Sequence, residues 1–329
     1  MRGSRRHPAP SATLAARACG NLADIEDARA VAERLGIPFT VIDCRERFDE
    51  DVIEPFVCAY EAGFTPNPCT ICNQRIKFGA LLEHAQRLGC DYLATGHYAR
   101  IERRDGGYAL LKARDATKDQ SYFLYGLGQD VLAHTLFPLG SLTKEGDVRR
   151  IAREQGFETA SKRDSQGICF LGKINYNDFI ERYLGKRVGK IVELETGKVL
   201  GKHNGYWFHT IGQRKGLGLS GGPWFVIKKD IKRNIIYVSN GYDPETQYGK
   251  VINMQGFDFI TEDPWGEFEG EKEITFKIRH TPEFTHGYIR RIGRSISCRI
   301  RRKRFKYRSW PYSVIYDKDH HLCSGQRHD

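Results

Sequence analysis

The chain has 329 residues, of which 40% are hydrophobic and 28% charged, as is ordinary for a globular protein of two or three domains. No apolar run approaches the roughly 20 residues that a membrane-spanning helix needs, so we expect no membrane span. The formal net charge of +11 favours a polyanionic partner, because lysine and arginine release the counterions of the phosphates that they bind. A generically basic protein is the alternative.

Residues 1–20 contain four arginines, no acidic residue, and several alanines and serines. This composition resembles an organellar transit peptide, and an unstructured segment explains it equally well. The nine cysteines are odd in number, form no short-spaced framework and accompany no secretory signal, which predicts a reducing compartment. We therefore expect a cytoplasmic protein, with a mitochondrion or plastid as the alternative if the N-terminus is a transit peptide.

The first half of the chain alternates helical patterns with short apolar runs. Apolar residues at helical spacing predict one helix that Asp24 caps and Gly36 ends, and another over 71–88. A short apolar run follows each helix, at 38–43 and at 91–95, and predicts a buried strand. A helix followed by a strand, twice, is typical of a parallel α/β sheet.

Two further patterns complete this half. Asp105-Gly106-Gly107 stands between two apolar runs and predicts a hairpin. Thr143 predicts the cap of another helix, which ends near Gly156. We place the edge of the α/β domain near residue 165.

After about residue 186, β-branched and aromatic runs alternate with glycine-rich turns. The runs that predict strands here are 189–192, 206–211, 224–227 and 235–238, and a later set includes 274–278 and 312–316. The sequence therefore predicts four parts. They are an unstructured N-terminus at 1–20, a catalytic α/β domain at 21–165, a central β-rich domain at 166–245 and a small β domain at 246–329.

Two cysteines, Cys69 and Cys72, stand at C-x-x-C spacing directly before a predicted helix. The partial positive charge at a helix N-terminus lowers the pKa of a thiol there. Three functions fit this pattern: a nucleophile, a redox pair, or two ligands of a metal or iron–sulfur cluster. Cys169, in the string DSQGICF at the predicted domain edge, is either exposed or an ordinary core cysteine.

Three other patterns suit nucleotide or RNA binding, although each is weak alone. Gly96-His97 follows a predicted strand, where open α/β sheets bind ligands. Lys118-Asp119-Gln120 offers groups for a phosphate and a base, or else begins a solvated helix. Cations with interleaved aromatics suit RNA, and they occur in the runs 209–218, 279–280 and 299–308.

The strings TPNPCTICNQRIKF, ATGHYARI, KDQSYFLY, DSQGICFLG and HTIGQRKGLG stand in the order expected of tRNA-specific 2-thiouridylases. From about Asn21 to Gly293 the chain resembles this family of tRNA-uridine 2-sulfurtransferases. The resemblance implies an adenine-nucleotide-alpha-hydrolase-like α/β domain, a small central domain and a C-terminal β-barrel. It implies ATP-dependent 2-thiolation of the wobble uridine in tRNAs for Lys, Glu and Gln, with magnesium. A persulfide donor or sulfur-relay protein would supply the sulfur.

The resemblance also implies residue roles. Cys169 would carry a persulfide, and Cys72 would be the nucleophile that attacks it. Gly96 would touch ATP. The residues implied around the flipped-out uridine are Asn67, Pro68 and Cys69, and those implied to contact tRNA are His97, Lys118, Asp119, Gln120, Arg279 and His280.

The sequence departs from the family pattern in three places. Cys69 replaces an aspartate that many members carry, and with Cys72 and Cys169 it forms a set that also fits iron–sulfur ligation. No phosphate-binding Ser-Gly-Gly-x-Asp-Ser loop occurs in the chain, which predicts an N-terminally truncated, incomplete ATP site. After about residue 294 the C-terminus is atypical. A tRNA-binding remnant without catalysis is the alternative, and a redox protein unrelated to RNA leaves the net charge unexplained.

Overall fold

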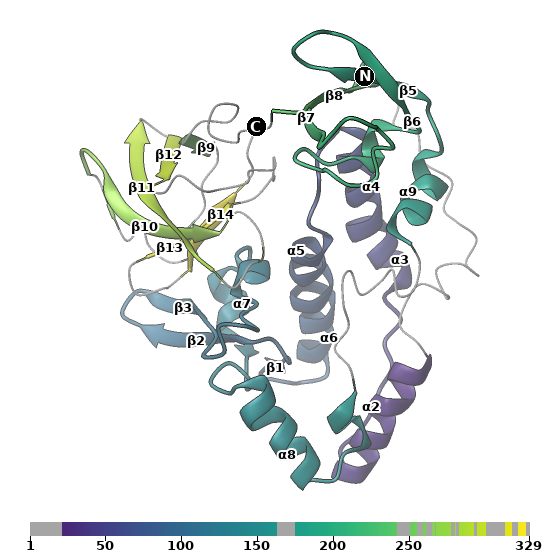
Figure 1. The fold of residues 1–329 in the computed structure, drawn as a ribbon. Coiled ribbons are helices and arrows are strands. Elements are labelled where there is room, and N and C mark those ends of the chain that lie inside the picture. Colours follow the sequence, from purple (N-terminus) through teal and green to yellow (C-terminus); the bar gives the residue numbers. More distant parts are fainter. Residues whose placement is uncertain are drawn as a thin grey trace, which may run out of the picture.

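The structure is a computed structural model that describes residues 22–162, 175–241, 251–254, 259–260, 265–266, 268–277, 280, 283–292, 295–300, 313–317 and 322–326. Helices dominate its first half and strands its second half (Figure 1). None of the described helices combines the length and the apolar character needed to span a lipid bilayer.

The helices of the first half begin where capping residues and proline allow. The predicted 71–88 helix is confirmed, but it begins earlier, because Pro68 fits the first helical position. The helix predicted to start at Asp24 is confirmed with that residue inside its first turn. The helical segments up to residue 87 are α2 (Leu22–Leu35), α3 (Arg45–Phe48), η1 (Asp49–Ile53), α4 (Glu54–Glu61), α5 (Pro68–Cys72), η2 (Asn73–Ala80) and α6 (Leu81–Arg87).

The parallel sheet is present in a short form. β1 (Leu93–Ala94) pairs in parallel with β4 (Thr135–Leu136), which confirms a strand inside the predicted 91–95 run. The strand predicted at 38–43 is wrong, since this segment has no strand geometry and Val41 is 55% exposed. A strand needs a neighbour to accept its ladder hydrogen bonds, and none of the described strands pairs with this segment.

The remaining elements of this half follow the predicted turns. The hairpin is confirmed, because its two strands pair in antiparallel register, and Gly106 in the turn and Gly107 at the start of the second strand both adopt positive φ. Thr143 precedes the next helical run as predicted, and Gly156 ends it with φ +66°. These elements are β2 (Ala99–Arg104), β3 (Gly107–Lys112), η3 (Ser121–Leu124), α7 (Gln129–Ala133), η4 (Lys144–Val148), α8 (Arg149–Glu154) and η5 (Glu158–Ser161).

The central domain packs a mixed sheet on two helices. The sheet has the order β6-β5-β8-β7, and its apolar face meets α4 and α9 in one core, which contains Phe56, Tyr60 and Ile180. Helix α4 therefore belongs to the core of the domain that follows it in sequence. The elements are α9 (Tyr176–Leu184), β5 (Gly189–Glu193), β6 (Val199–His203), η7 (Tyr206–Phe208), β7 (Phe225–Asp230) and β8 (Ile235–Ser239).

One predicted strand of this domain is wrong. Residues 206–211 begin with the single 3-10 turn η7 instead of a strand. Tyr206 and Trp207 are both buried, whereas consecutive side chains of a strand point to opposite faces of the sheet. The chain turns here so that both aromatic rings enter the same core.

The C-terminal part of the chain is β-rich as predicted, and it forms a six-stranded antiparallel sheet with the order β14-β13-β10-β11-β12-β9. Val314 and Tyr316 of this sheet join Leu110, Tyr122 and Leu124 of the α/β half in a second apolar core. The strands are β9 (Val251–Met254), β10 (Lys272–Lys277), β11 (Thr285–Ile292), β12 (Ser295–Ile300), β13 (Ser313–Tyr316) and β14 (Leu322–Gln326).

The α/β half also exposes eight large apolar side chains. They are 40–81% exposed, and they are Leu22, Leu35, Ile37, Val41, Leu88, Tyr92, Leu136 and Ile151. Helix α2 buries only Ala32. Polar groups hold this helix instead: Nζ of Lys162 bonds to the carboxylates of Asp24 and Asp27, and Arg34 donates to main-chain carbonyls near Gly156.

Candidate functional site

The two cysteines of the C-x-x-C motif lie in the first turn and a half of a long helix. α5 begins at Pro68 and runs on through η2 and α6 to Arg87. Asn67 at its N-cap is extended, with φ −109° and ψ 93°. Cys69 and Cys72 are half-buried and three residues apart, so their side chains share one helix face near its positive end.

This helix packs on the turn that follows the Lys118–Gln120 segment. Nδ2 of Asn73 donates to the carbonyl of Phe123 at 3.0 Å, and Nε2 of Gln74 donates to the carbonyl of Gly126 at 3.1 Å. A Cβ on Gly126 would lie 1.5 Å from Nε2 of Gln74, so a larger residue there would displace the Gln74 side chain. The cysteine motif and the KDQSYF motif are therefore neighbours in the fold.

Gly96 and His97 follow β1 but differ in exposure. Gly96 is exposed, and a Cβ there would meet only Cδ1 of Leu139 at an ordinary 3.8 Å. His97 is 8% exposed, between the rings of Phe78 and Phe137 at centroid distances of 5.6 and 5.8 Å. Burial, followed by the charge of Lys77, lowers its pKa to about 4.

Because its pKa is lowered this far, the imidazole of His97 is neutral at physiological pH. Its Nδ1 lies 2.8 Å from Oγ1 of Thr95. The ring packs in the protein interior rather than standing on the surface. The contact of His97 with tRNA therefore stays a prediction.

The Lys118–Gln120 segment turns its three side chains to different surroundings. Gln120 exchanges two hydrogen bonds with the main chain of Tyr98: its Oε1 accepts from N and its N donates to O, both at 2.9 Å. Lys118 is half-buried, whereas Asp119 is only 2% exposed. The segment is thereby fixed to the start of β2, next to His97.

Two predicted site residues, Cys169 and Arg279, lie outside the described residues. The neighbour of the second, His280, is exposed and stacks on Phe123 with a ring-centroid distance of 4.7 Å. In the described part of the chain, no group of three or more His, Cys, Asp or Glu side chains is placed to hold a metal. The set Cys69, Cys72 and Cys169 stays a prediction for either persulfide or iron–sulfur chemistry.

Lys229, whose sequence context carries no functional signal, is half-buried in a basic cluster of the central domain with the buried His203 and His209. The rings of His203 and His209 lie 5.6 Å apart, and Nζ of Lys229 donates to the carbonyl of His209 at 3.3 Å. Burial lowers the pKa of Lys229 to about 8 and, as the largest cause, that of His209 to about 4. Lys229 differs from its neighbours in its burial, and a Lys-Lys-Asp sequence does not reveal which lysine is buried.

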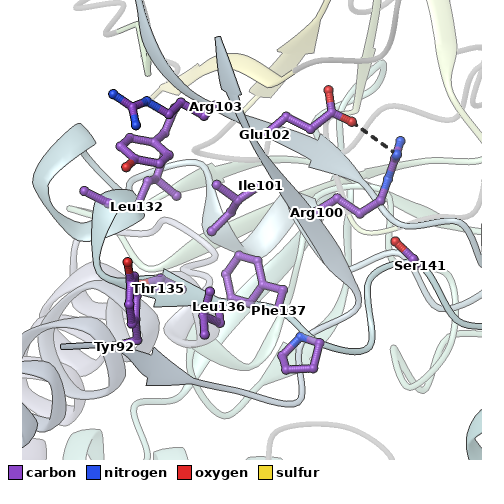
Figure 2. Close-up of a pocket in the computed structure, with 13 residues that line it drawn as sticks. Tyr92, Arg100, Ile101, Glu102, Arg103, Leu132, Thr135, Leu136, Phe137 and Ser141 are labelled. Atoms are coloured by element: carbon purple, nitrogen blue, oxygen red, sulfur yellow. Dashed lines mark hydrogen bonds and ion pairs between the residues drawn. The ribbon is translucent and has the colours of Figure 1, made fainter. Parts of the chain in front are cut away.

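A pocket of about 590 Å³ opens between β4 and the β2–β3 hairpin (Figure 2). Ile101, Leu136 and Phe137 give it apolar side chains. Arg100 and Glu102 also line it and form an ion pair at 3.4 Å. The lining residues are Tyr92, Arg100, Ile101, Glu102, Arg103, Tyr108, Leu132, Ala133, Thr135, Leu136, Phe137, Pro138 and Ser141. None of the predicted site residues is among them.

Comparison with known proteins gives two family matches. Residues 6–173 match the tRNA methyl transferase HUP domain, and residues 177–240 match the tRNA methyl transferase PRC-barrel domain. The first match begins inside the N-terminal segment. Together the matches agree with the nucleotide alpha hydrolase-like α/β domain and the small β domain that the sequence predicts.

The chain is also similar to curated relatives along most of its length. It is 62% identical over 304 residues to tRNA-specific 2-thiouridylase MnmA of Parabacteroides distasonis, covering 92% of this chain and 84% of that protein. It is 52% identical over 306 residues to the protein of the same name in Porphyromonas gingivalis, with the same two coverages. For the Alkaliphilus oremlandii protein the identity is 44% over 250 residues, 75% of this chain and 68% of the relative. The chain belongs to the tRNA-specific 2-thiouridylase family.

Proposed function

We propose that this chain catalyses ATP-dependent 2-thiolation of the wobble uridine of tRNA through a cysteine persulfide. The observation that carries the proposal is the placement of Cys69 and Cys72. They lie at the positive end of a long helix that is fixed to the KDQSYF motif. A helix N-terminus stabilises a thiolate, which is the form of cysteine that attacks a persulfide.

The chemistry assigns one step to each group. O2 of the uridine attacks the α-phosphorus of ATP, pyrophosphate leaves, and C2 becomes open to attack. The thiolate of Cys72 attacks the inner sulfur of the Cys169 persulfide, so that a Cys72–Cys169 disulfide forms and hydrosulfide leaves. Hydrosulfide adds to C2, and AMP departs with the former O2. An external thiol then reduces the disulfide, and a persulfide donor reloads Cys169.

Two sets of residues would take the two substrates. Exposed Gly96 leaves the main chain open to a nucleotide, and Asn67, Pro68 and Cys69 would line the target uridine. Magnesium would accompany the phosphates of ATP. Lys118, Gln120 and His280, together with the net charge of +11, would hold tRNA for Lys, Glu or Gln.

The test is thiolation of unmodified tRNA by the purified chain with ATP, magnesium and a persulfide donor, read by nucleoside mass spectrometry. We expect 2-thiouridine from the wild type and none from Cys169→Ser or Cys72→Ser. The exposed Cys90→Ser is the matched control, because this residue lies beyond the far end of α6 from the motif. It should leave the product yield unchanged.

A second measurement separates the roles of the cysteines. Persulfide labelling after incubation with the donor should disappear in Cys169→Ser, while tRNA binding survives. Labelling that persists in this variant would contradict the assignment. Stoichiometric iron after anaerobic reconstitution, lost in Cys69→Ser, would support cluster ligation in place of the persulfide. A wild type that binds tRNA but yields no product would point to an incomplete ATP site.

A further inference from the structure

Asp119 and Lys277 form a buried ion pair between the α/β half and the C-terminal sheet. Nζ of Lys277 lies 2.9 Å from Oδ2 of Asp119, and the two residues are 158 positions apart in the chain. The side chain of Asp119 is 2% exposed and that of Lys277 is 0% exposed. Both charges are therefore almost completely removed from water.

The surroundings of the pair satisfy both charges. Oδ1 of Asp119 accepts from the main-chain N of Ala113 at 3.1 Å and of Ser121 at 3.3 Å. Its Oδ2 also accepts from Oγ of Ser121 at 3.1 Å, and that hydroxyl lies 3.1 Å from the hydroxyl of Tyr316 in β13. Among the described residues, every polar contact of the carboxylate thus comes from the protein interior.

The ammonium group has an equally specific environment. Nζ of Lys277 lies 4.2 Å from the ring centroid of Phe284 and 5.9 Å from that of Tyr316. These two rings meet edge to face at 4.9 Å. Aromatic faces stabilise a cation that has lost its water, so the lysine is held by one carboxylate and two rings.

Such a pair contributes little to stability, but it restricts how the two parts can be arranged. Desolvation of both charges offsets most of their attraction, and an apolar pair of similar volume is often as stable. An apolar interface, however, tolerates small displacements, whereas a buried pair with this many directed bonds has one satisfied arrangement. The pair therefore fixes how the C-terminal sheet sits on the α/β half.

The pair lies where two proposed tRNA-contacting segments meet. Lys118 and Gln120 flank Asp119, and His280 follows Lys277 by three positions. The stacking of His280 on Phe123, at 4.7 Å, joins the same two segments a second time. Asp119 itself has no oxygen left for RNA, because interior donors occupy both.

We propose that Asp119 and Lys277 are positioning residues, which we call the interdomain clamp, and that Asp119 does not contact tRNA. The clamp sets Lys118 and Gln120 of one half and His280 of the other into a single surface for the tRNA backbone. This proposal rests on the proposed tRNA function of that surface.

The test is a double-mutant cycle of Asp119→Asn and Lys277→Met in the full chain. Each single variant leaves one buried charge uncompensated, so its urea midpoint falls. The double variant removes both charges and recovers most of the midpoint. Its tRNA dissociation constant, measured by filter binding, nevertheless rises roughly two- to thirtyfold, because the two segments are no longer held in register.

The salt dependence of binding distinguishes positioning from contact. The clamp variants remove no phosphate contact, so the slope of log Kd against log salt stays as in the wild type. Lys118→Met is the matched control: its urea midpoint should be unchanged and its slope reduced by about one. A double variant that recovers stability and binds tRNA like the wild type would show a purely structural pair and overturn the proposal.

Two further outcomes are decisive. Suppose that Lys277→Met alone leaves tRNA binding unchanged and that the double variant binds as weakly as Asp119→Asn alone. Asp119 then contacts RNA directly, and the clamp is refuted. If the wild type fails to bind tRNA at low salt, the proposed function falls first. Coupling in the urea cycle would then still report whether the two charges interact.

Discussion

Single buried residues set the response of this protein to pH. His97 and His209 are each 8% exposed, and burial is the largest cause that lowers the pKa of both to about 4. In the unfolded chain each has its ordinary pKa of about 6.5. Between these values the unfolded chain binds protons that the folded chain refuses, so acid favours unfolding.

We therefore expect stability to be fully present above about pH 6.5 and to be lost as the pH falls towards 4. The slope contributed by each histidine is about 1.4 kcal/mol per pH unit within this window. Urea unfolding at half-unit steps of pH measures it. His97→Gln should remove one histidine's share, whereas His134→Gln, on an exposed ring, is the control. An unchanged slope in His97→Gln would refute the assignment.

At the scale of elements, helix α2 is held by charges rather than by apolar packing. Lys162 bonds to Asp24 and Asp27, and Arg34 donates to two carbonyls after α8, at 2.7 and 3.0 Å. Exposed ion pairs contribute about 0.2–1 kcal/mol each, and salt screens them. The helix should therefore open without the rest of the domain.

The corresponding prediction concerns Lys162→Met. We expect amide hydrogen exchange across α2 to quicken by up to roughly fivefold for each pair lost, with little change in α4. Raising the salt concentration should produce the same pattern in the wild type. Lys186→Met, which removes a different exposed pair with Glu181, is the control and should leave α2 unaffected. Equal acceleration in both helices would mean that α2 is not an independent unit.

Elements differ in how far their sequences predict them. Strands β5 and β8 match their predicted runs within a residue, because their apolar residues and flanking turns are local signals. The run at 38–43 has a similar composition, but none of the described strands lies beside it, and composition cannot reveal which strands become neighbours. The cysteine helix was predictable for the same local reasons. The clamp could not be predicted from the sequence, because its two residues are 158 positions apart and meet only when the C-terminal sheet packs on the α/β half.

At the scale of the whole molecule, large apolar side chains remain exposed outside the two apolar cores. The cores lie under the central sheet and under the C-terminal sheet, whereas the exposed apolar side chains occur on the α/β half and, with Val188 and Val199, on the central domain. Exposed apolar side chains promote association between copies where they gather into a patch. Concentration should therefore affect the size of the particle in solution.

A charge placed among the exposed apolar side chains of the α/β half tests that expectation. Val41→Lys should lower the apparent mass in light scattering at high concentration and reduce binding of a hydrophobic dye. Its free energy of unfolding should change by less than about 0.5 kcal/mol, because the side chain is 55% exposed. Val57→Lys, at 1% exposure, is the contrasting variant and should unfold the central core. Identical scattering from Val41→Lys and the wild type would show that the exposed apolar side chain of Val41 does not drive association.

The exposed apolar side chains of the α/β half also affect how long the protein persists in a cell. Chaperones that hold unfolded chains recognise exposed apolar segments, and proteases cleave what opens often. A folded molecule that displays Leu35, Ile37 and Val41 beside a helix held by ion pairs offers both signals at once. Its abundance would then be set by quality control, with turnover starting at α2 while the two β domains are still folded.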